Sequence, residues 1–431
     1  MSEALLASFR EAYRNLELLP LLAGTALDRF WVDYGAEAIE ELEQLIEDSP
    51  AGDSKIIFTG HRGCGKSTLL AQLSRQLADR YFVVFFSIAD AIEMSDVNHI
   101  NILFAIAVRL MAEAEQRQIE IQPSVKQALH RWFASHTRTE TEVVGADASV
   151  GFNLFQLIAG KLKADATIRN EIKQEFLRKV SDLIARINEI AAVVEAATQQ
   201  EVLVIIDDLD KLDLQVVREI YQDHIKALFQ PNFRLVLTIP ISALRQVSLA
   251  ATIDTETNNQ IVQMPVAKLF HKDELRQPDA VPIADTMMRL QAVLKKRLQP
   301  ELIEPEALQA LILQSGGVLR ELIRIANECC RLCLRQIRRQ PDRTDIVIDK
   351  VVLIEAVNKL RLDFDTRLGK ADYGILTTTY RELKPDDPKE QRFLDLLHGL
   401  YVLEYRNHQL WYDVHPIVVE LLRDREQASD G

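Results

Sequence analysis

The sequence predicts an α/β fold built on a parallel sheet, and three observations support this prediction. Four apolar runs lack the alternation of a half-exposed strand, which is typical of parallel strands covered on both faces. Stretches with helical periodicity separate these runs. A glycine-rich turn joins the first run to the helix that follows it. The four runs are residues 56–59, 81–88, 202–206 and 234–239.

The glycine-rich turn has the spacing G-x-x-x-x-G-K-[ST] of a phosphate-binding loop. Its glycines let the backbone turn tightly and present N–H groups to phosphate oxygens, and the following helix adds its positive dipole end. We expect Lys66 to reach the β- and γ-phosphates of ATP, and Ser67 to ligate Mg²⁺. A glycine turn with a surface lysine is the alternative. The predicted nucleotide-binding residues are Gly60, His61, Arg62, Gly63, Cys64, Gly65, Lys66, Ser67 and Thr68.

The run at 202–206 is followed by a pair of carboxylates. Asp207 comes directly after the strand, where a carboxylate can hold Mg²⁺ through its water shell. Asp208 is then placed to orient or deprotonate the attacking water. Aspartate is shorter than the glutamate more usual in fast ATPases, so we expect slow hydrolysis. In the alternative interpretation, Asp208 and Asp210 cap the next helix.

Two more residues are predicted to detect the γ-phosphate. Thr238 lies near the end of the run 234–239, although a threonine is also ordinary in a strand. Arg320 follows two glycines at the start of a predicted helix, from which it could report whether ATP or ADP is bound. The alternative is a surface arginine whose charge opposes the helix dipole.

The composition of the chain argues against several classes of protein. The net charge of −13 argues against nucleic-acid binding by the whole surface of the 431-residue chain. Four cysteines argue against a disulfide framework, and the start of the chain lacks the features of a signal peptide. We therefore expect a cytoplasmic protein without a membrane partner. A local arginine patch fits either a solvated helix face or a contact with DNA or a subunit; it comprises Arg331, Arg335, Arg338, Arg339 and Arg343.

The sequence outside the predicted ATPase core indicates further domains. Lys66 and Asp207 lie 141 positions apart (207 − 66), which implies an insertion, the segment most suited to a protein-specific role. Within it we expect a loop at 135–151 and one long helix at 171–197. The last segment reads as two helices and a β-hairpin, the order of a winged helix. The predicted parts are an N-terminal helical segment with an adenine-side linker (1–50), the ATPase core (51–275) with its helical insertion (98–200), a helical lid (276–362) and a winged-helix domain (363–431).

Residues 27–335 resemble the AAA+/STAND branch of P-loop ATPases, whose Orc/Cdc6-like and NACHT-like relatives share this order of parts. The matching motifs are the Walker A loop Gly60–Ser67, the Walker B strand Val202–Asp208, a sensor-1-like Thr238 and a sensor-2-like Arg320. The resemblance implies that the segment Arg29–Val32 holds the adenine, with Phe30 and Val32 among the binding residues.

The sequence departs from the family pattern at two places. Pro240 stands close behind Thr238, in a context less polar than is usual for that sensor. For an arginine finger, Arg218 and Arg234 are the only candidates, which puts hydrolysis across ring subunits in doubt.

Taken together, these features predict an ATP-dependent molecular switch for signalling, defence or regulation. Thr238 and Arg320 would couple the nucleotide state to a protein partner or to self-association. The first alternative is a DNA-loading ATPase of the Orc/Cdc6 type, which would bind duplex DNA through the winged helix or the arginine patch. The second is a scaffold that holds nucleotide without turnover.

Overall fold

The computed structural model describes residues 2–22, 24–49, 53–138, 154–406 and 409–429. By the contacts among its residues, the chain divides into two compact units. We call them the loop unit (residues 1–36, 60–69 and 264–431) and the sheet unit (residues 37–59 and 70–263). In this division the phosphate-binding loop groups with the C-terminal part of the chain, and the predicted domain boundaries stay a prediction.

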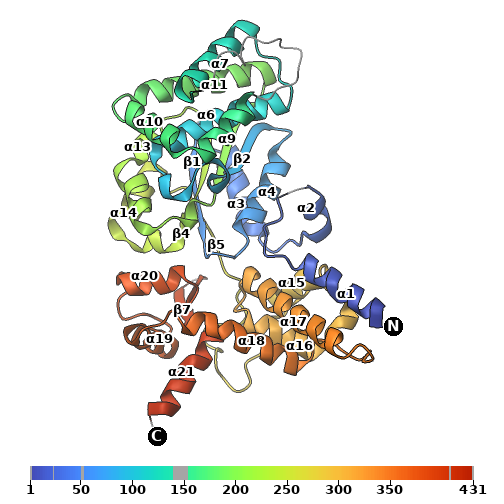
Figure 1. The fold of residues 1–431 in the computed structure, drawn as a ribbon. Coiled ribbons are helices and arrows are strands. Elements are labelled where there is room, and N and C mark those ends of the chain that lie inside the picture. The colour runs from blue at the N-terminus through green and yellow to red at the C-terminus, as the bar shows by residue number, and fades with distance from the viewer. Residues whose placement is uncertain (1, 23, 50–52, 139–153, 407–408, 430–431) are drawn as a thin grey trace. The chain divides into compact units, whose positions relative to one another are not determined.

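The sheet unit contains a five-stranded sheet with the order β2-β3-β4-β1-β5 (Figure 1). Strand β2 runs parallel to β3, with Ser87 opposite Asp207 at their carboxyl ends, and β3 runs parallel to β4. The predicted parallel sheet is confirmed. Strand β5 was not predicted, because it is short and only alternate residues of it are buried. The strands are β1 (Lys55–Gly60), β2 (Tyr81–Ser87), β3 (Glu201–Asp207), β4 (Arg234–Pro240) and β5 (Ile261–Met264).

Helices fill the described part of the predicted insertion between β2 and β3. Helix α6 is apolar on nearly every side, and α9, α10 and α11 pack against it. The expected single helix at 171–197 is wrong, because Lys179 leaves the helical conformation between α10 and α11. Most of the expected loop at 135–151 lies outside the described residues. The helices are α5 (Ile88–Ala91), η1 (Met94–Asp96), α6 (His99–Gln116), α7 (Pro123–His136), α9 (Leu154–Ala164), α10 (Ala166–Phe176) and α11 (Val180–Thr198).

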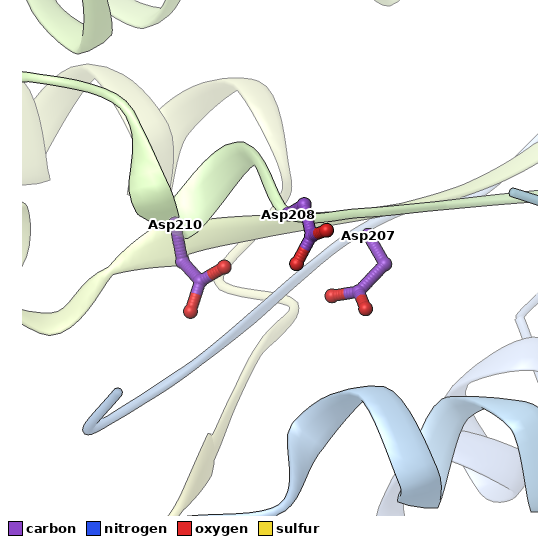
Figure 2. A group of neighbouring side chains, drawn as sticks. All are labelled: Asp207, Asp208 and Asp210. Atoms are coloured by element: carbon purple, nitrogen blue, oxygen red, sulfur yellow. The ribbon is translucent and has the colours of Figure 1, made fainter. Parts of the chain in front are cut away.

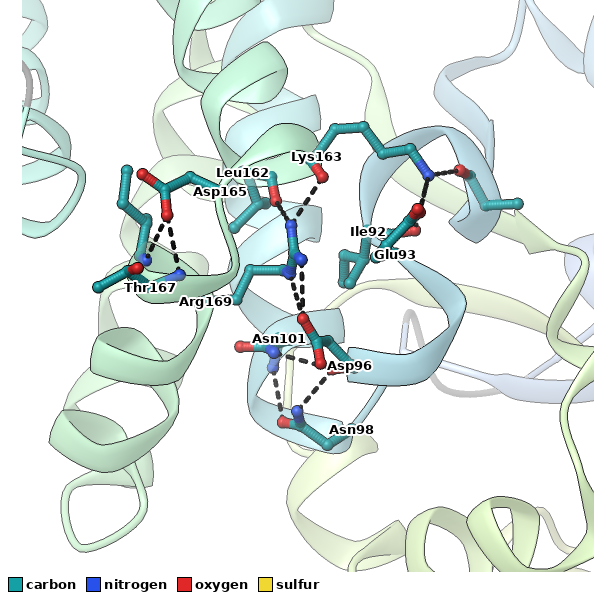
Figure 3. A network of polar contacts seen from close by, with 12 residues as sticks. Ile92, Glu93, Asp96, Asn98, Asn101, Leu162, Lys163, Asp165, Thr167 and Arg169 are labelled. Atoms are coloured by element: carbon teal, nitrogen blue, oxygen red, sulfur yellow. Dashed lines mark hydrogen bonds and ion pairs between the residues drawn. The ribbon is translucent and has the colours of Figure 1, made fainter.

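A polar network joins the insertion to the segment that follows β2 (Figure 3). The guanidinium of Arg169 is buried, and its Nε donates to Asp96 at 2.8 Å. Its Nη1 donates to the carbonyl oxygens of Leu162 and Lys163 at 2.8 and 2.7 Å. A buried charge is tolerated when it is paired and its donors are used. This network therefore fixes the turn between α9 and α10 against η1.

Shorter helices complete the sheet unit and its borders. A π-helical turn, η3, interrupts the helical run after α12. These elements are α3 (Ala36–Glu47), α4 (Lys66–Leu77), η2 (Leu209–Lys211), α12 (Leu214–Arg218), η3 (Glu219–Asp223), α13 (Ile225–Leu228), η4 (Ile241–Arg245) and α14 (Val247–Glu256).

The loop unit contains the helices predicted for the lid. Helix α17 has a strongly apolar face that packs against α1 and α18. Its three cysteines lie on this face, and burial raises the pKa of Cys333 to about 12. The helices are α1 (Ser2–Asn15), α2 (Gly24–Phe30), α15 (Ala284–Lys295), η5 (Pro300–Leu302), α16 (Pro305–Gln314), α17 (Leu319–Arg339) and α18 (Lys350–Asp365).

The last segment has the predicted order of two helices and an antiparallel hairpin, followed by a helix that was not predicted. Tyr405 and Trp411 stack across the hairpin, with ring centroids 4.4 Å apart. Two residues of its tip, 407–408, lie outside the described residues. Among the described residues, none of the helices is long and apolar enough to cross a membrane. The elements are α19 (Lys370–Glu382), α20 (Gln391–His398), β6 (Val402–Arg406), β7 (Leu410–Val414) and α21 (Pro416–Ser429).

We predict that acid destabilises the sheet unit through His99, the first residue of α6. His99 is 5% exposed, and its ring stacks on that of His224, with centroids 3.9 Å apart. Burial, with smaller effects of His224 and Lys173, lowers the pKa of His99 to about 4. The folded protein therefore binds this proton less tightly than the unfolded chain does. Stability should fall between about pH 6.5 and pH 4, by up to about 3 kcal/mol.

Chemical denaturation of the wild type and of His99→Gln between pH 7 and pH 4 tests this expectation. The variant should lose less stability on acidification than the wild type. His271→Gln, a change at an exposed histidine, is the control and should follow the wild type. Equal acid losses in the wild type and His99→Gln would contradict the assignment.

Candidate nucleotide-binding site

The predicted phosphate-binding loop has the conformation that its glycines require. It connects the end of β1 to the start of α4. Gly60, Gly63 and Gly65 have φ angles of 155°, 83° and 104°, which side chains rarely tolerate. Space is limited as well, since a Cβ on Gly63 would lie 2.6 Å from the Cβ of Arg320. A Cβ on Gly65 would lie 2.1 Å from the hydroxyl of Tyr34.

The ammonium group of Lys66 is held at the loop. Its Nζ donates to the carbonyl oxygens of Gly60 and His61, both at 2.9 Å. The side chain is only 4% exposed, so the charge lies within the loop rather than in solvent. The motif predicts a lysine at this position, and the ammonium group of that lysine is expected to bind phosphate. Ser67, which is half-buried, follows on the first turn of α4.

Arg320 contacts the loop, and its predicted role of detecting the γ-phosphate stays a prediction. Its backbone N–H donates to the carbonyl of Gly63 at 2.9 Å, and its side chain packs on the same glycine. Burial, and then the nearby charge of Arg62, lower the pKa of the Arg320 guanidinium. Two like charges beside a glycine loop repel each other until an anion compensates them. The arrangement therefore favours an anion.

The predicted adenine-side segment is joined to both the lid and the loop. Arg297, two residues after the end of α15, donates to the carbonyl of Phe30 at 3.4 Å, and its guanidinium lies 4.9 Å from the centre of the Phe30 ring. The hydroxyl of Tyr34 donates to the carbonyl of Gly65 at 3.1 Å. Phe30 and Val32 are half-buried. Adenine binding by these two residues stays a prediction.

Thr68 connects the loop to the N-terminal linker. Its hydroxyl accepts a hydrogen bond from the backbone N–H of Leu21 at 3.0 Å. Thr68 is 8% exposed, so in this conformation it anchors the linker. A direct contact of Thr68 with nucleotide stays a prediction.

The C-terminal hairpin also contacts the loop, which the sequence analysis did not predict. Nε2 of His61 accepts a hydrogen bond from the backbone N–H of Glu404 in β6 at 2.7 Å. The hydroxyl of Tyr405 donates to the carbonyl of Gly316, in the turn before α17, at 3.0 Å. All these groups are buried. The motif does not require a histidine at position 61, and its partner is 343 positions away, so no local signal indicated the contact.

Three carboxylates gather at the carboxyl end of β3 in the sheet unit (Figure 2). Asp207, Asp208 and Asp210 are buried, and each offers an oxygen within 4.8 Å of the others. Carboxylate oxygens are the ligands that Mg²⁺ prefers. The donor set therefore fits the magnesium ion expected at Asp207, and it includes Asp210 as well.

Asp208 has an unusual conformation and two partners. Its φ of 69° is left-handed, which an aspartate adopts only occasionally. Its carboxylate accepts a hydrogen bond from the hydroxyl of Ser87 at 2.7 Å and pairs with Lys211 at 2.5 Å. The side chain does not cap η2, so the capping alternative is wrong for this residue. Its role as a catalytic base stays a prediction.

Thr238 connects strand β4 to the turn that carries the carboxylates. It is fully buried, and its hydroxyl accepts the backbone N–H of Leu209 at 3.0 Å and faces the carbonyl of Ile206 at 3.5 Å. In this conformation it positions the turn, and detection of phosphate stays a prediction. Arg234 is buried and paired with Glu201, so it is not available as an arginine finger.

Part of the chain matches a known protein family. Residues 36–230 match a family model described as the AAA ATPase domain. The solved structure of Cdc6p from Pyrobaculum aerophilum is similar at 12% identity and a TM-score of 0.41, over 92% of this chain and 95% of that one. The ORC2 protein of Aeropyrum pernix, in ADPNP–ADP complexes, has the same identity and TM-score over 97% and 98%. None of the curated proteins compared with the chain matches it.

We predict that Gly63→Ala abolishes ATP binding. The new Cβ would collide with Arg320 at a φ of 83°, and strain of this kind costs about 1–3 kcal/mol. The loop must shift, and its N–H groups then lose their alignment on phosphate. Titration with a fluorescent ATP analogue, together with thermal melting, checks the result.

Gly160→Ala is the matched control for this substitution. Gly160 lies in α9, and a Cβ there would meet nothing within 4 Å. Alanine should leave ATP affinity unchanged and stabilise the helix by about 0.5–1 kcal/mol. Retained ATP affinity in Gly63→Ala would show that the loop does not bind the phosphates.

Proposed function

We propose that this chain is an ATP-dependent molecular switch, because residues 36–230 match the family model of the AAA ATPase domain. Its nucleotide state would be passed to a protein partner or to another copy of the chain. Two contacts within the loop unit carry the proposal. The phosphate-binding loop meets Arg320 through Gly63, and it meets the hairpin through His61 and Glu404. A loop that changes conformation on binding ATP would alter both contacts.

The proposed ATP-binding groups come from the loop and its neighbours. Lys66 and Arg320 would neutralise phosphate charge, and Lys66 would exchange carbonyl acceptors for phosphate oxygens. Ser67 and Asp207 would hold Mg²⁺, which neutralises charge on the β- and γ-phosphates when bound. The family match supports nucleotide binding, and the individual roles are our proposal.

In this proposal, hydrolysis depends on Asp208 and is slow. Asp208 would accept a proton from the attacking water. Its carboxylate is engaged by Ser87 at one oxygen and by Lys211 at the other, and both contacts stabilise the charged form and make it a weaker base. Slow turnover suits a switch, because the ATP-bound state must persist long enough for a partner to recognise it.

A DNA-loading ATPase is the second candidate, and the end of α17 favours it. Arg335, Arg338 and Arg339 are exposed there, whereas Arg331 pairs with Glu328. Three exposed guanidinium groups on one helix end can contact the phosphates of a duplex. Against this candidate stands the net charge of −13.

One experiment separates the two candidates. We would measure ATP turnover and particle mass together, with and without duplex DNA, for the wild type and Asp208→Asn. The switch predicts slow turnover that DNA does not change and a particle mass that ATP changes. Asp208→Asn should lower turnover about 100-fold or more, the usual effect of losing a general base.

Controls make each outcome interpretable. Asp213→Asn changes an exposed carboxylate close to Asp208 and should keep wild-type turnover. Turnover that rises with DNA, and falls again in an Arg335→Gln/Arg338→Gln variant, would favour the DNA-loading candidate. ATP binding without measurable turnover in the wild type would favour the remaining alternative, a scaffold that holds nucleotide without hydrolysing it.

A further inference from the structure

A cleft in the sheet unit lies between the insertion and strand β2, and the proposed function makes no use of it. Its volume is about 390 Å³, within the range of about 300–1,000 Å³ typical of small-molecule sites. Helices α6 and α9 line two sides of it. Val84 and Phe85 of β2, with Asp90 of α5, line the third. Strand β2 is an edge strand of the sheet.

Arg109 of α6 lines this cleft, and among the described residues its guanidinium forms no ion pair. Among the described residues, its one hydrogen bond goes from Nη2 to the carbonyl of Asp90 at 3.1 Å, and no carboxylate oxygen lies within 4.0 Å of it. Its guanidinium lies 5.5 Å from the centre of the Phe86 ring. The residue is half-buried, and burial lowers the pKa of its guanidinium. A partly desolvated guanidinium with unused donors favours an anionic ligand.

The other cation in the cleft is already engaged. The ammonium group of Lys163 donates to the carbonyl oxygens of Ala89 and Ile92 at 2.6 and 3.2 Å. It also pairs with the carboxylate of Glu93 at 2.9 Å (Figure 3). These contacts use its three donors. Arg109 is therefore the cationic side chain that a ligand would meet.

Of the two acidic side chains in the cleft, one forms an ion pair and the other does not. Glu113 accepts a hydrogen bond from Arg117 at 2.7 Å, so its charge is compensated. Asp90 is exposed, and among the described residues its carboxylate forms no ion pair within 4.0 Å. Arg109 and Asp90 are therefore the two oppositely charged groups of the cleft that form no ion pair within 4.0 Å among the described residues. The charges of Asp90 and Glu113 do act on the Arg109 guanidinium over a longer distance.

The cleft also has room beside helix α9. Gly160 lines it, and a Cβ there would meet nothing within 4 Å. Glycine inside a helix is less stable than alanine by about 0.5–1 kcal/mol, so helix stability does not explain its presence. The amides of Gln116 and Gln156 lie in the same lining and can donate or accept hydrogen bonds.

We propose that this cleft binds a small zwitterion of the amino-acid type. The carboxylate of the ligand would pair with Arg109, and its ammonium group would pair with Asp90. A simple anion would meet the unpaired carboxylate of Asp90, and a simple cation would meet the guanidinium of Arg109. A ligand that carries both charges can pair directly with both groups. The proposal rests on the cleft alone and does not depend on ATP hydrolysis.

Calorimetric titration of the full-length chain, without nucleotide, tests the proposal. The probes are the common L-amino acids one at a time, with propionate and ethylamine as ligands that carry only one of the two charges. At least one amino acid should bind, and propionate and ethylamine should bind at least about tenfold more weakly. Arg109→Met keeps the apolar stem and should also weaken binding about tenfold or more.

Two glycine variants provide a matched pair. Gly160→Met should fill the cleft and abolish binding. Gly374→Met, at a helical glycine of α19 that also has open space around it, should leave binding unchanged. Thermal melting shows that each variant folds. The proposal is overturned if no amino acid binds at millimolar concentration, if propionate binds as tightly as the amino acid, or if Arg109→Met retains wild-type affinity. None of these results affects the proposed switch.

Discussion

The phosphate-binding loop is the constraint on which the rest of the loop unit depends. Between the end of β1 and the start of α4 its backbone forms no strand or helix, which leaves N–H groups for phosphate. Three distant segments hold it instead. Arg320, Tyr34 and Glu404 donate hydrogen bonds to acceptors of the loop: two carbonyl oxygens and the ring nitrogen of His61. Each of these segments is therefore placed to respond when phosphate arrives.

Much of this site could be predicted from the sequence, because its chemistry depends on local order. The glycines of the loop and the carboxylates after β3 each follow an apolar strand, and in a parallel sheet that order determines where the strand end lies. The partners of these groups could not be predicted. Ser87 bonds Asp208 across 121 positions, and Glu404 bonds His61 across 343. No motif specifies such pairs.

In the insertion, too, local structure could be predicted from the sequence, and long-range packing could not. Its helical periodicity predicted helices, but not the break at Lys179, where the chain leaves the helix before α11. Periodicity also predicted nothing about the cleft, which depends on how α6 and α9 meet the edge of the sheet. Arg109 and Gly160 are unremarkable in sequence, since a charged residue and a glycine are both tolerated on exposed helix faces. The role that we propose for them follows from the packing around them.

Hydrogen exchange at the hairpin tests the central claim, which is that nucleotide binding at the loop changes the contacts of the C-terminal hairpin. The backbone N–H of Glu404 is protected by its bond to His61. A non-hydrolysable ATP analogue with Mg²⁺ should draw Lys66 and Arg320 toward phosphate, disturb that bond and speed exchange in residues 402–406. The effect should disappear in Lys66→Ala. Unchanged exchange in the hairpin when the analogue is bound would contradict the account.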